Sequence, residues 1–452
     1  MRRRKAQTDH GLMNELQPDH SHLTNQDVRP GDEPPAAGPA GGGQAGPGPA
    51  GQAGRGPART RPAGEAGRGP ARTRLGGQAG SRSAEAGGAT QRCRVKVGSA
   101  DGILAVVPHL LGFHPANSLV VLGIGGPHAR IRLAFRYDLP DPPQDVLSVD
   151  IASHAMAVLC REHLTMVVIV GYGTGTAVSS VVDVIAPALR EAGIAIQDAL
   201  RVEDGRYWSY LCQEPRCCPP EGVPYNPAAH PAAAVLAAAG LTVRSDRAAL
   251  VGTLARAPES IEPMSHAIER TRRRAAQLIE DTMSVTGDGD PLQAIADAGR
   301  RSVRQAVARY RRGGEINDHD EIAWLGFTLT DLRVRDDAWA RMDPQFNEAH
   351  QRLWTHLLHH LPAEFTPAPA ALLAFVAWQA GDGALASIAI ERALDADPSY
   401  SMALLLADAL HAGLPPSAAR LSMSPKQVAA SYARHRRPPA TSANRRRPPT
   451  TS

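Results

Sequence analysis

Residues Leu104–Gly123, LAVVPHLLGFHPANSLVVLG, decide the expected fold, because a helix, a polar loop and a strand follow one another there. An apolar helix is predicted up to a glycine turn at Gly112, with a kink or break at Pro108. The polar loop 114–118 leads into an uninterrupted apolar run that starts at Leu119. Such a run is typical of a buried central strand. The stretch therefore predicts an α/β core.

The next segments continue the alternation of strands and helices. Residues 130–137 alternate in polarity and predict a strand that pairs with the first through a GGPH turn. A helix over about 145–163 comes next. An apolar strand over 165–170 then leads through a glycine-rich turn to a helix over about 176–192 and a strand over 194–202. This strand–helix–strand order predicts a crossover, and hence some parallel pairing.

A short strand over 206–211 and a proline-rich loop end the α/β part, and the pattern then becomes helical. The predicted helices cover 229–240, 246–254, 260–284, 291–312, 319–331, 344–361, 367–380, 384–396 and 401–412. The fold class is thus an α/β N-terminal domain with a mixed, partly parallel sheet, followed by an all-helical portion and flanked by disordered tails.

Composition sets the expected domain boundaries. Residues 1–94 are a low-complexity tail rich in Gly, Ala, Pro and Arg, and 425–452 form a basic tail. Between them we expect the α/β domain over 95–225 and the helical portion over 226–424. The helical portion contains one tetratricopeptide-like hairpin, 367–398, whose small residues allow close helix packing.

The formal net charge of +4 hides a strong segregation. The first 94 residues hold 14 Lys and Arg against 8 Asp and Glu, and residues 425–452 hold seven basic and no acidic residues. The body between them is therefore acidic, which argues against a basic nucleic-acid-binding domain. No apolar run is long enough to span a membrane, and no apolar segment follows the charged start as in a signal peptide. Five cysteines do not make a disulfide scaffold, so we expect a cytoplasmic protein.

Nucleic acid could be bound only through the basic tails or through residues 418–437. The repeat AGRGPARTR, at 53–61 and 66–74, is interpreted as an extension without a specific partner, with a nucleic-acid-binding arm as the alternative. Residues 418–437 resemble a helix-turn-helix in which Ser424 and Pro425 open the second helix. There Lys426, Gln427 and Ser431 would face a groove of the DNA.

The first candidate site surrounds the opening loop and combines His109, His114, Asn117 and Ser118. Two imidazoles, an amide and a hydroxyl could bind a ligand or take part in catalysis. The alternative is structural, with these side chains tying the turn to its own backbone. The loop enters its strand at the amino end, whereas ligands in open α/β sheets gather at the carboxyl ends.

The glycine turn after the 165–170 strand is a second candidate, because such a turn can cradle a phosphate at a helix N-terminus. Its glycines are Gly171, Gly173 and Gly175, with the spacing G-x-G-x-G. This differs from the dinucleotide-binding pattern. Asp198 is the acid expected to bind a ribose, and an ordinary tight turn is the alternative.

The third candidate is the group Cys212, Cys217 and Cys218. Three thiolates could bind zinc, although a structural zinc site takes four ligands and adjacent cysteines are not expected to point at one metal easily. A disulfide, a nucleophilic cysteine served by His109 or His114, and plain structural thiols are the alternatives.

Two histidine- and acid-rich segments are weaker candidates. His356 and His360 share a helix face and could hold a metal, but the glutamate of a zinc-protease motif is missing, so a solvated face is favoured. The run from Asn317 to Glu321 lacks the periodicity of a calcium loop and is interpreted as a helix cap.

Three blocks in this order resemble an actinobacterial domain-of-unknown-function family, number four-one-nine-two. They are GILAVVPHLLGFHPANSLVVLGI, RVEDGRYWSYLCQEPRCCPPEG and AWQAGDGALASIAIERALDADPSYSMALLLADALHAGLPP, and the resemblance covers about 95–416. It implies an actinobacterial cytoplasmic protein and assigns no activity, cofactor or partner.

The sequence therefore predicts a module that binds a ligand or a partner near the 109–118 loop. One alternative is a hydrolase- or transferase-like enzyme using His114 with Asn117 or a cysteine of 212–218. Its discriminating feature would be one cleft lined by His114 and the cysteine loop. The other alternative is DNA binding through 418–437.

Overall fold

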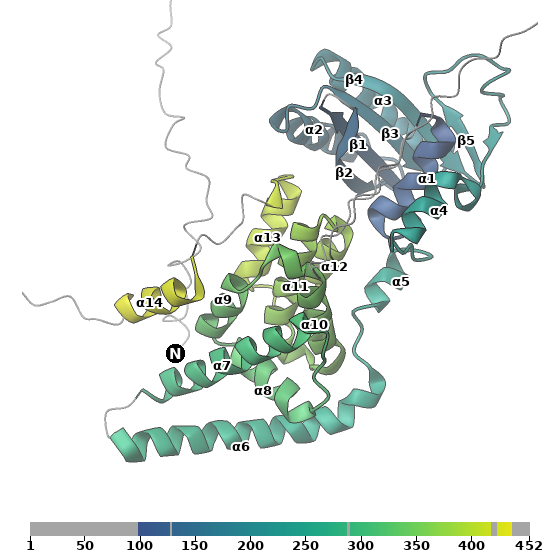
Figure 1. The fold of residues 1–452 in the computed structure, drawn as a ribbon. Helices are drawn as coiled ribbons and strands as arrows, with labels where there is room; N and C mark the ends of the chain where they lie inside the picture. Colours follow the sequence, from purple (N-terminus) through teal and green to yellow (C-terminus); the bar gives the residue numbers. More distant parts are fainter. Residues whose placement is uncertain (1–97, 127–128, 287–289, 417–422, 436–452) are drawn as a thin grey trace, which may run out of the picture. The chain divides into compact units, whose positions relative to one another are not determined.

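The computed structural model describes residues 98–126, 129–286, 290–416 and 423–435 (Figure 1). The predicted N-terminal tail, the AGRGPARTR repeat and residues 436–452 lie outside the described residues. Within them, the predicted fold class is confirmed: a mixed six-stranded sheet comes first, and helices follow it.

The sheet has the strand order β2-β1-β3-β4-β5-β6. Its strands are β1 (Ser118–Gly125), β2 (Arg130–Asp138), β3 (Met166–Tyr172), β4 (Ala195–Glu203), β5 (Arg206–Ser209) and β6 (Val223–Pro224). β3 and β4 are parallel, as the predicted crossover requires, and every other pair is antiparallel. Strand β1 lies between β2 and β3, which explains why it is apolar on both faces.

Helices cover both faces of the sheet (Figure 1). Helices α2 (Asp145–Arg161) and α3 (Gly175–Glu191) pack on the face that carries Leu119, Val121 and Ile169. Helix α1 (Ala100–Leu111) packs on the opposite face. It runs through Pro108 as one helix, so the break that we allowed for does not occur.

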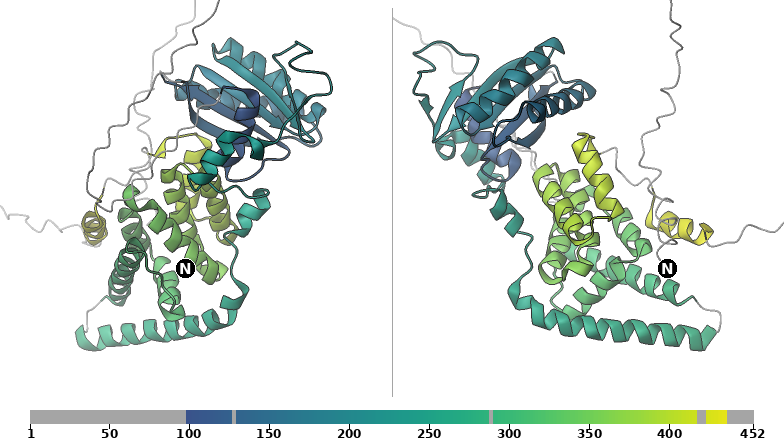
Figure 2. Two further views of the ribbon diagram at one scale, coloured as in Figure 1. Left: turned by 45° about the vertical axis from the view of Figure 1, so that its right-hand side comes forward. Right: turned by 180° about the vertical axis from the view of Figure 1, so that it is seen from behind.

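The rest of the described chain is helical, as two further views show (Figure 2). Its helices are α4 (Pro231–Ala238), α5 (Arg247–Gly252), α6 (Ile261–Thr286), α7 (Pro291–Arg311), α8 (His319–Leu329), α9 (Leu332–Ala340), α10 (Asn347–His360), α11 (Pro367–Ala380), α12 (Gly383–Ala396), α13 (Ser401–His411) and α14 (Pro425–His435). In the part of the chain that the structure describes, every helix is too short or too polar to cross a bilayer.

Helix α9 was missed because four of its seven buried residues are charged. Arg333, Arg335, Asp336 and Asp337 all lie buried, and Arg335 and Asp336 form an ion pair at 2.6 Å. A helix that buries charged residues lacks the apolar stripe by which sequence patterns reveal helices.

The 367–398 segment forms the predicted pair of helices, α11 and α12. Ala374, Ala386 and Ala393 are all buried, and the two helices pack extensively on each other. Helix α11 is buried on every side from Ala368 to Trp378, so it is a core helix of this portion rather than a wall of an open groove.

Candidate functional site

A cleft of about 390 Å³ opens at one edge of the sheet, where three loops meet. Its lining comes from the end of α1, the opening loop, the glycine turn, the β4–β5 turn and the segment after β6. The lining residues are Pro108, His114, Pro115, Ala116, Asn117, Tyr172, Gly173, Thr174, Val202, Glu203, Asp204, Gly205, Tyr225 and Pro227. His114 and Asn117 of the first candidate site and Gly173 of the second are thus brought together in one cleft.

Strand directions explain why these loops converge. β1 is antiparallel to β3, so its first residue, Ser118, pairs with the last residue of β3, Tyr172. Tyr172 in turn pairs with Val202 near the end of parallel β4. The amino end of β1 therefore lies at the carboxyl ends of β3 and β4, the edge where α/β sheets bind ligands. The opening loop was expected to lie at the end of the sheet where ligands bind less often. The register corrects this expectation.

The opening loop is held in place from beneath the cleft. Ser118 is fully buried, and its hydroxyl donates to the carbonyl of Ala116 at 2.5 Å and accepts from Arg136 Nε at 2.7 Å. Asn117 adopts a left-handed conformation with φ of 45°, and its carbonyl accepts from the Leu139 amide at 2.9 Å. The Ser118 hydroxyl is thus used inside the fold, whereas Asn117 and the exposed His114 line the cleft.

Gly173 brings the glycine turn close to this loop. Its φ is +154°, and a Cβ there would lie 3.2 Å from Leu139 Cδ1 and 3.7 Å from Asn117 Oδ1. Its amide donates to the carbonyl of Val202 at 3.0 Å, which ties the turn to β4. A side chain at this position would therefore crowd the wall between the two loops.

The first turn of α3 opens at the cleft through its cap, Thr174. The Thr174 hydroxyl accepts from the Ala177 amide at 3.4 Å. An amide in a helix donates to the carbonyl four residues earlier, and for Gly175 and Thr176 that carbonyl lies before the helix begins. Their amides are therefore not used by the hydrogen bonds of the helix itself. With no acidic residue in this turn, the positive end of the helix dipole is not neutralised from within the helix.

Arg201 adds positive charge beside this helix end, although it is outside the cleft lining. Its Nη1 lies so close to Gly175 that a Cβ there would be 2.3 Å away. The guanidinium is stacked on Trp208, 3.8 Å from the ring centroid, and Arg201 Nε is 3.9 Å from Glu203 Oε2. The positive end of the helix dipole repels a cation beside it. An anion bound next to both would be attracted by both positive charges.

Acidic and aromatic side chains line the far side of the cleft. Glu203 ends β4, and Asp204 begins the turn into β5. Tyr225 is anchored by its amide, which donates to the carbonyl of Gly205 at 3.0 Å. These residues were not proposed from the sequence, although Glu203-Asp204-Gly205 follows a predicted strand and could have been recognised as a strand-end loop.

Tyr172, which also lines the cleft, carries a buried polar atom. Its side chain is 7% exposed, and its hydroxyl has no hydrogen-bond partner among the described residues. Burial, and to a lesser degree the nearby Tyr225, raises the pKa of Tyr172 well above its usual value, so the hydroxyl is protonated and can donate. A buried hydroxyl without a partner is costly and requires an explanation.

Two residues considered with this site lie elsewhere. Asp198 pairs with Val168 in the middle of the sheet, and its carboxylate accepts from Ser209 Oγ at 2.9 Å. It is therefore away from the carboxyl edge, where Glu203 ends β4. His109 lies on α1 and bonds to the carbonyl of Leu241 at 3.1 Å, outside the cleft lining.

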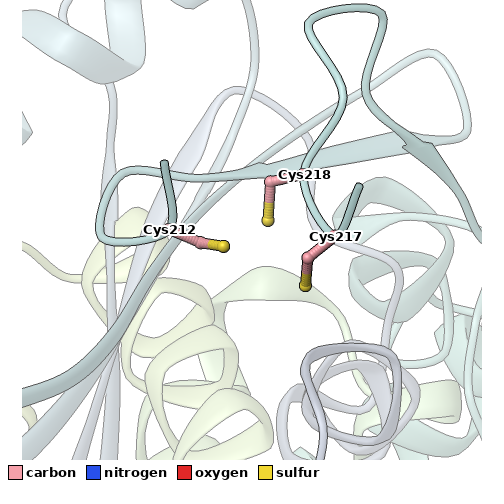
Figure 3. A group of neighbouring side chains, drawn as sticks. All are labelled: Cys212, Cys217 and Cys218. Atoms are coloured by element: carbon pink, nitrogen blue, oxygen red, sulfur yellow. The ribbon is translucent and has the colours of Figure 1, made fainter. Parts of the chain in front are cut away.

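The three cysteines form a separate cluster. The sulfur atoms of Cys212, Cys217 and Cys218 all lie within 4.8 Å of one another, and all three are free thiols (Figure 3). The two adjacent cysteines, which were not expected to point at one metal easily, thus have their sulfurs close to that of Cys212. None of them lines the cleft, so the structure does not bring a cysteine and His114 together.

The environment of the cluster differs from thiol to thiol. A hydrogen bond from the Glu214 backbone, with help from Cys218, lowers the pKa of Cys212. Desolvation and the neighbouring thiols raise the pKa of Cys218 to about 12.

The second helix of the predicted helix-turn-helix exists as α14, and the first lies outside the described residues. Ser424 caps α14 together with Gln427, whose side chain accepts from the Ser424 amide at 2.8 Å. Ser431 is buried and Tyr432 donates to Asp336 on α9 at 2.5 Å. Gln427 is thus used in capping and Ser431 faces the protein rather than solvent.

The weaker candidates have local structural partners. His356 and His360 stack with ring centroids 4.4 Å apart, and His356 is half-buried rather than freely solvated. His360 Nδ1 bonds to the carbonyl of His356 at 2.9 Å. Asp318 caps α8 through the Asp320 amide, as predicted for this run. Among the described residues, only the three cysteines group as possible metal ligands.

Comparison with known proteins is consistent with this picture and assigns no activity. Neither the curated proteins nor the solved structures that were searched contain a significant match. One family model matches residues 101–417, which is most of the chain and includes the cleft and the cysteine loop. The chain therefore belongs to the family described as Domain of unknown function (DUF4192).

Proposed function

We propose that this chain is a cytoplasmic ligand-binding protein whose cleft takes a mononucleotide-type ligand. In this arrangement the first turn of α3 binds a phosphate, Glu203 binds a ribose hydroxyl, and the nucleobase lies against Tyr225. The cleft volume of about 390 Å³ lies within the range of small-ligand sites.

The topology supports a phosphate at the glycine turn. β3, α3 and β4 form a parallel crossover, and the cleft lies at its carboxyl edge. There the free amides of the first helical turn and the nearby Arg201 guanidinium favour an anion. The phosphate would lie by Gly173 and Thr174.

The opposite side of the cleft supports a sugar and a base. Glu203 ends the strand that is parallel to β3, the position from which an acid reaches a ribose in dinucleotide-binding folds. Tyr225, Pro108 and Pro227 offer apolar surface to a planar ring. A ligand that is anionic at one end and carries hydroxyls at the other matches this division of charge.

The observation that carries the proposal is the Tyr172 hydroxyl. Tyr172 lines the cleft, and its hydroxyl is buried, protonated and without a hydrogen-bond partner among the described residues. A ligand acceptor would satisfy it. The form of the enzyme alternative that pairs His114 with a cysteine lacks such support, because no cysteine lines the cleft. The DNA-binding alternative lacks it because Ser431 of α14 is buried.

Calorimetric titration of the full chain with AMP, ADP, ATP and NAD⁺ tests the proposal. We expect at least one of these compounds to bind, with Glu203→Gln weakening it by about 10-fold or more, because a bond to a charged group is lost. Glu162→Gln, at the C-terminal cap of α2 and outside the cleft lining, is the matched control and should bind as the native chain does. The proposal would be contradicted if none of the four compounds binds. It would also be contradicted if Glu203→Gln binds as tightly as the control Glu162→Gln.

A further inference from the structure

We propose that Cys212, Cys217 and Cys218 form a three-thiolate site for Zn²⁺, with the fourth coordination position taken by a ligand from solution. This site is separate from the cleft, and the proposal does not depend on the function suggested above.

The sulfur geometry is close to what a zinc ion requires. Tetrahedral Zn²⁺ with Zn–S bonds of about 2.3 Å places its sulfurs about 3.8 Å apart. The three sulfurs already lie within 4.8 Å of one another, so closing around the ion needs shifts of about 1 Å or less. Figure 3 shows Cys212 reaching across the loop toward the adjacent pair.

Hydrogen bonds from β5 hold the first ligand in place. Ser209 Oγ accepts from the amides of Leu211 and Cys212, both at 3.2 Å. The same hydroxyl donates to Asp198 at 2.9 Å, which fixes its orientation. Strand β5 thus determines where Cys212 begins the loop.

The remaining ligands are held by a turn and by the far end of the loop. The Glu214 carbonyl accepts from the amides of both Cys217 and Cys218, at 3.0 and 2.8 Å. Trp208 Nε1 donates to the carbonyl of Pro220 at 2.9 Å, and Gly222 packs against the Trp208 ring with φ of +82°. The loop is therefore anchored at both ends without any metal, which lowers the entropy cost of binding one.

The donor set favours a soft ion and leaves a position open. Thiolates select zinc and other thiophilic ions over Mg²⁺ or Ca²⁺. Among the described residues, no other His, Cys, Asp or Glu joins the group, and Cys93 lies outside the described residues. Each thiol releases its proton to solvent when the metal–sulfur bond forms, and no change of oxidation state is involved.

The test is a titration of the reduced, metal-free full chain with Zn²⁺ in competition with a chromophoric chelator. We expect one Zn²⁺ per chain and affinity losses on the order of 100-fold for Cys212→Ser, Cys217→Ser and Cys218→Ser. Cys160→Ser, which replaces an exposed thiol on α2, and Cys93→Ser should bind as the native chain does. Bound Zn²⁺ should also protect three thiols of the unmodified chain from alkylation, a measurement that needs no variant.

Three results would overturn the proposal: no Zn²⁺ bound, binding indifferent to the three loop substitutions, or no thiol protection. Loss of binding in Cys93→Ser would overturn the open fourth position. A disulfide among the three cysteines that persists under the reducing conditions of the titration would also contradict the site.

Discussion

Ser118, the first residue of β1, lies directly opposite Tyr172, the last residue of β3, in an antiparallel register. This pairing carries the polar loop before β1 to the carboxyl edge of the parallel strands. Ser118 uses its hydroxyl within the fold, whereas Tyr172 leaves its hydroxyl buried without a partner among the described residues. The contrast between the two residues leads to the first prediction.

Replacing Tyr172 with phenylalanine should leave the ligand-free protein as stable as before, or more stable by up to about 1 kcal/mol. The reason is that the substitution removes a buried polar atom that has no bond to lose. Ligand binding should weaken by about 5- to 30-fold, since the ligand loses a donor. Urea unfolding and calorimetric titration measure the two effects, and a clear loss of stability in Tyr172→Phe would show that the hydroxyl has a partner within the fold.

Tyr432→Phe should behave in the opposite way. The Tyr432 hydroxyl on α14 donates to the buried carboxylate of Asp336, which also pairs with Arg335. Its loss should reduce the free energy of unfolding by about 1–3 kcal/mol, because a charged acceptor is left with one bond fewer. Hydrogen exchange should also rise in α14. If the variant unfolds at the native urea concentration, α14 is not held to α9 in this way.

Gly171→Ala should destabilise the α/β core. A Cβ at Gly171 would lie 2.2 Å from Val178 Cγ1 on α3, and Val178 is fully buried. We expect a loss of about 1–3 kcal/mol from overpacking. Gly252→Ala is the matched control, because nothing lies within 4 Å of its new methyl group. Equal midpoints of thermal unfolding for the two variants would be incompatible with close β3–α3 packing.

The pH dependence of stability should show a contribution from His350 on α10. Burial, with help from Arg311, lowers the pKa of His350 to about 4, below its ordinary value of about 6.5. Between these values the unfolded chain binds a proton that the folded chain does not. Stability from this residue is therefore complete above about pH 6.5 and falls by about 1.4 kcal/mol per pH unit down to about pH 4.

His350→Phe should flatten this part of the stability profile, measured by urea unfolding at several pH values. The stability of the variant at neutral pH does not test the prediction, because replacing the buried His350 also changes the packing around it. The slope between pH 4 and 6.5 is the readout. An unchanged slope in the variant would mean that His350 is not held neutral in the fold.

Local patterns predicted most of the elements and missed those that depend on tertiary contacts. The apolar runs of β1 and β3 and the crossover to β4 followed from the sequence. Helix α9 could not be predicted in this way. Arg335 and Asp336 form an ion pair inside the protein, so charged residues occupy positions where an apolar stripe would otherwise indicate a helix. Pro108 did not break α1, although its ring removes one backbone donor.

The candidate site was predictable in part. His114, Asn117 and Gly173 were identified from the composition of two separate loops. That these loops share one cleft follows from the antiparallel pairing of β1 with β3, which no local pattern encodes. That Asp198 lies outside the cleft was not predictable for a similar reason, since a count of residues does not show where a strand ends at the sheet edge.

Hydrogen exchange with and without saturating nucleotide tests the central proposal most directly, because it locates binding as well as detecting it. The panel member that binds most tightly should slow exchange at residues 114–117, 172–177 and 203–205, the loops that form the cleft. Segments that do not line the cleft, such as the buried helix α11, should be unchanged. Unaltered exchange in all three loops, or protection confined to other segments, would contradict a nucleotide site at this edge of the sheet.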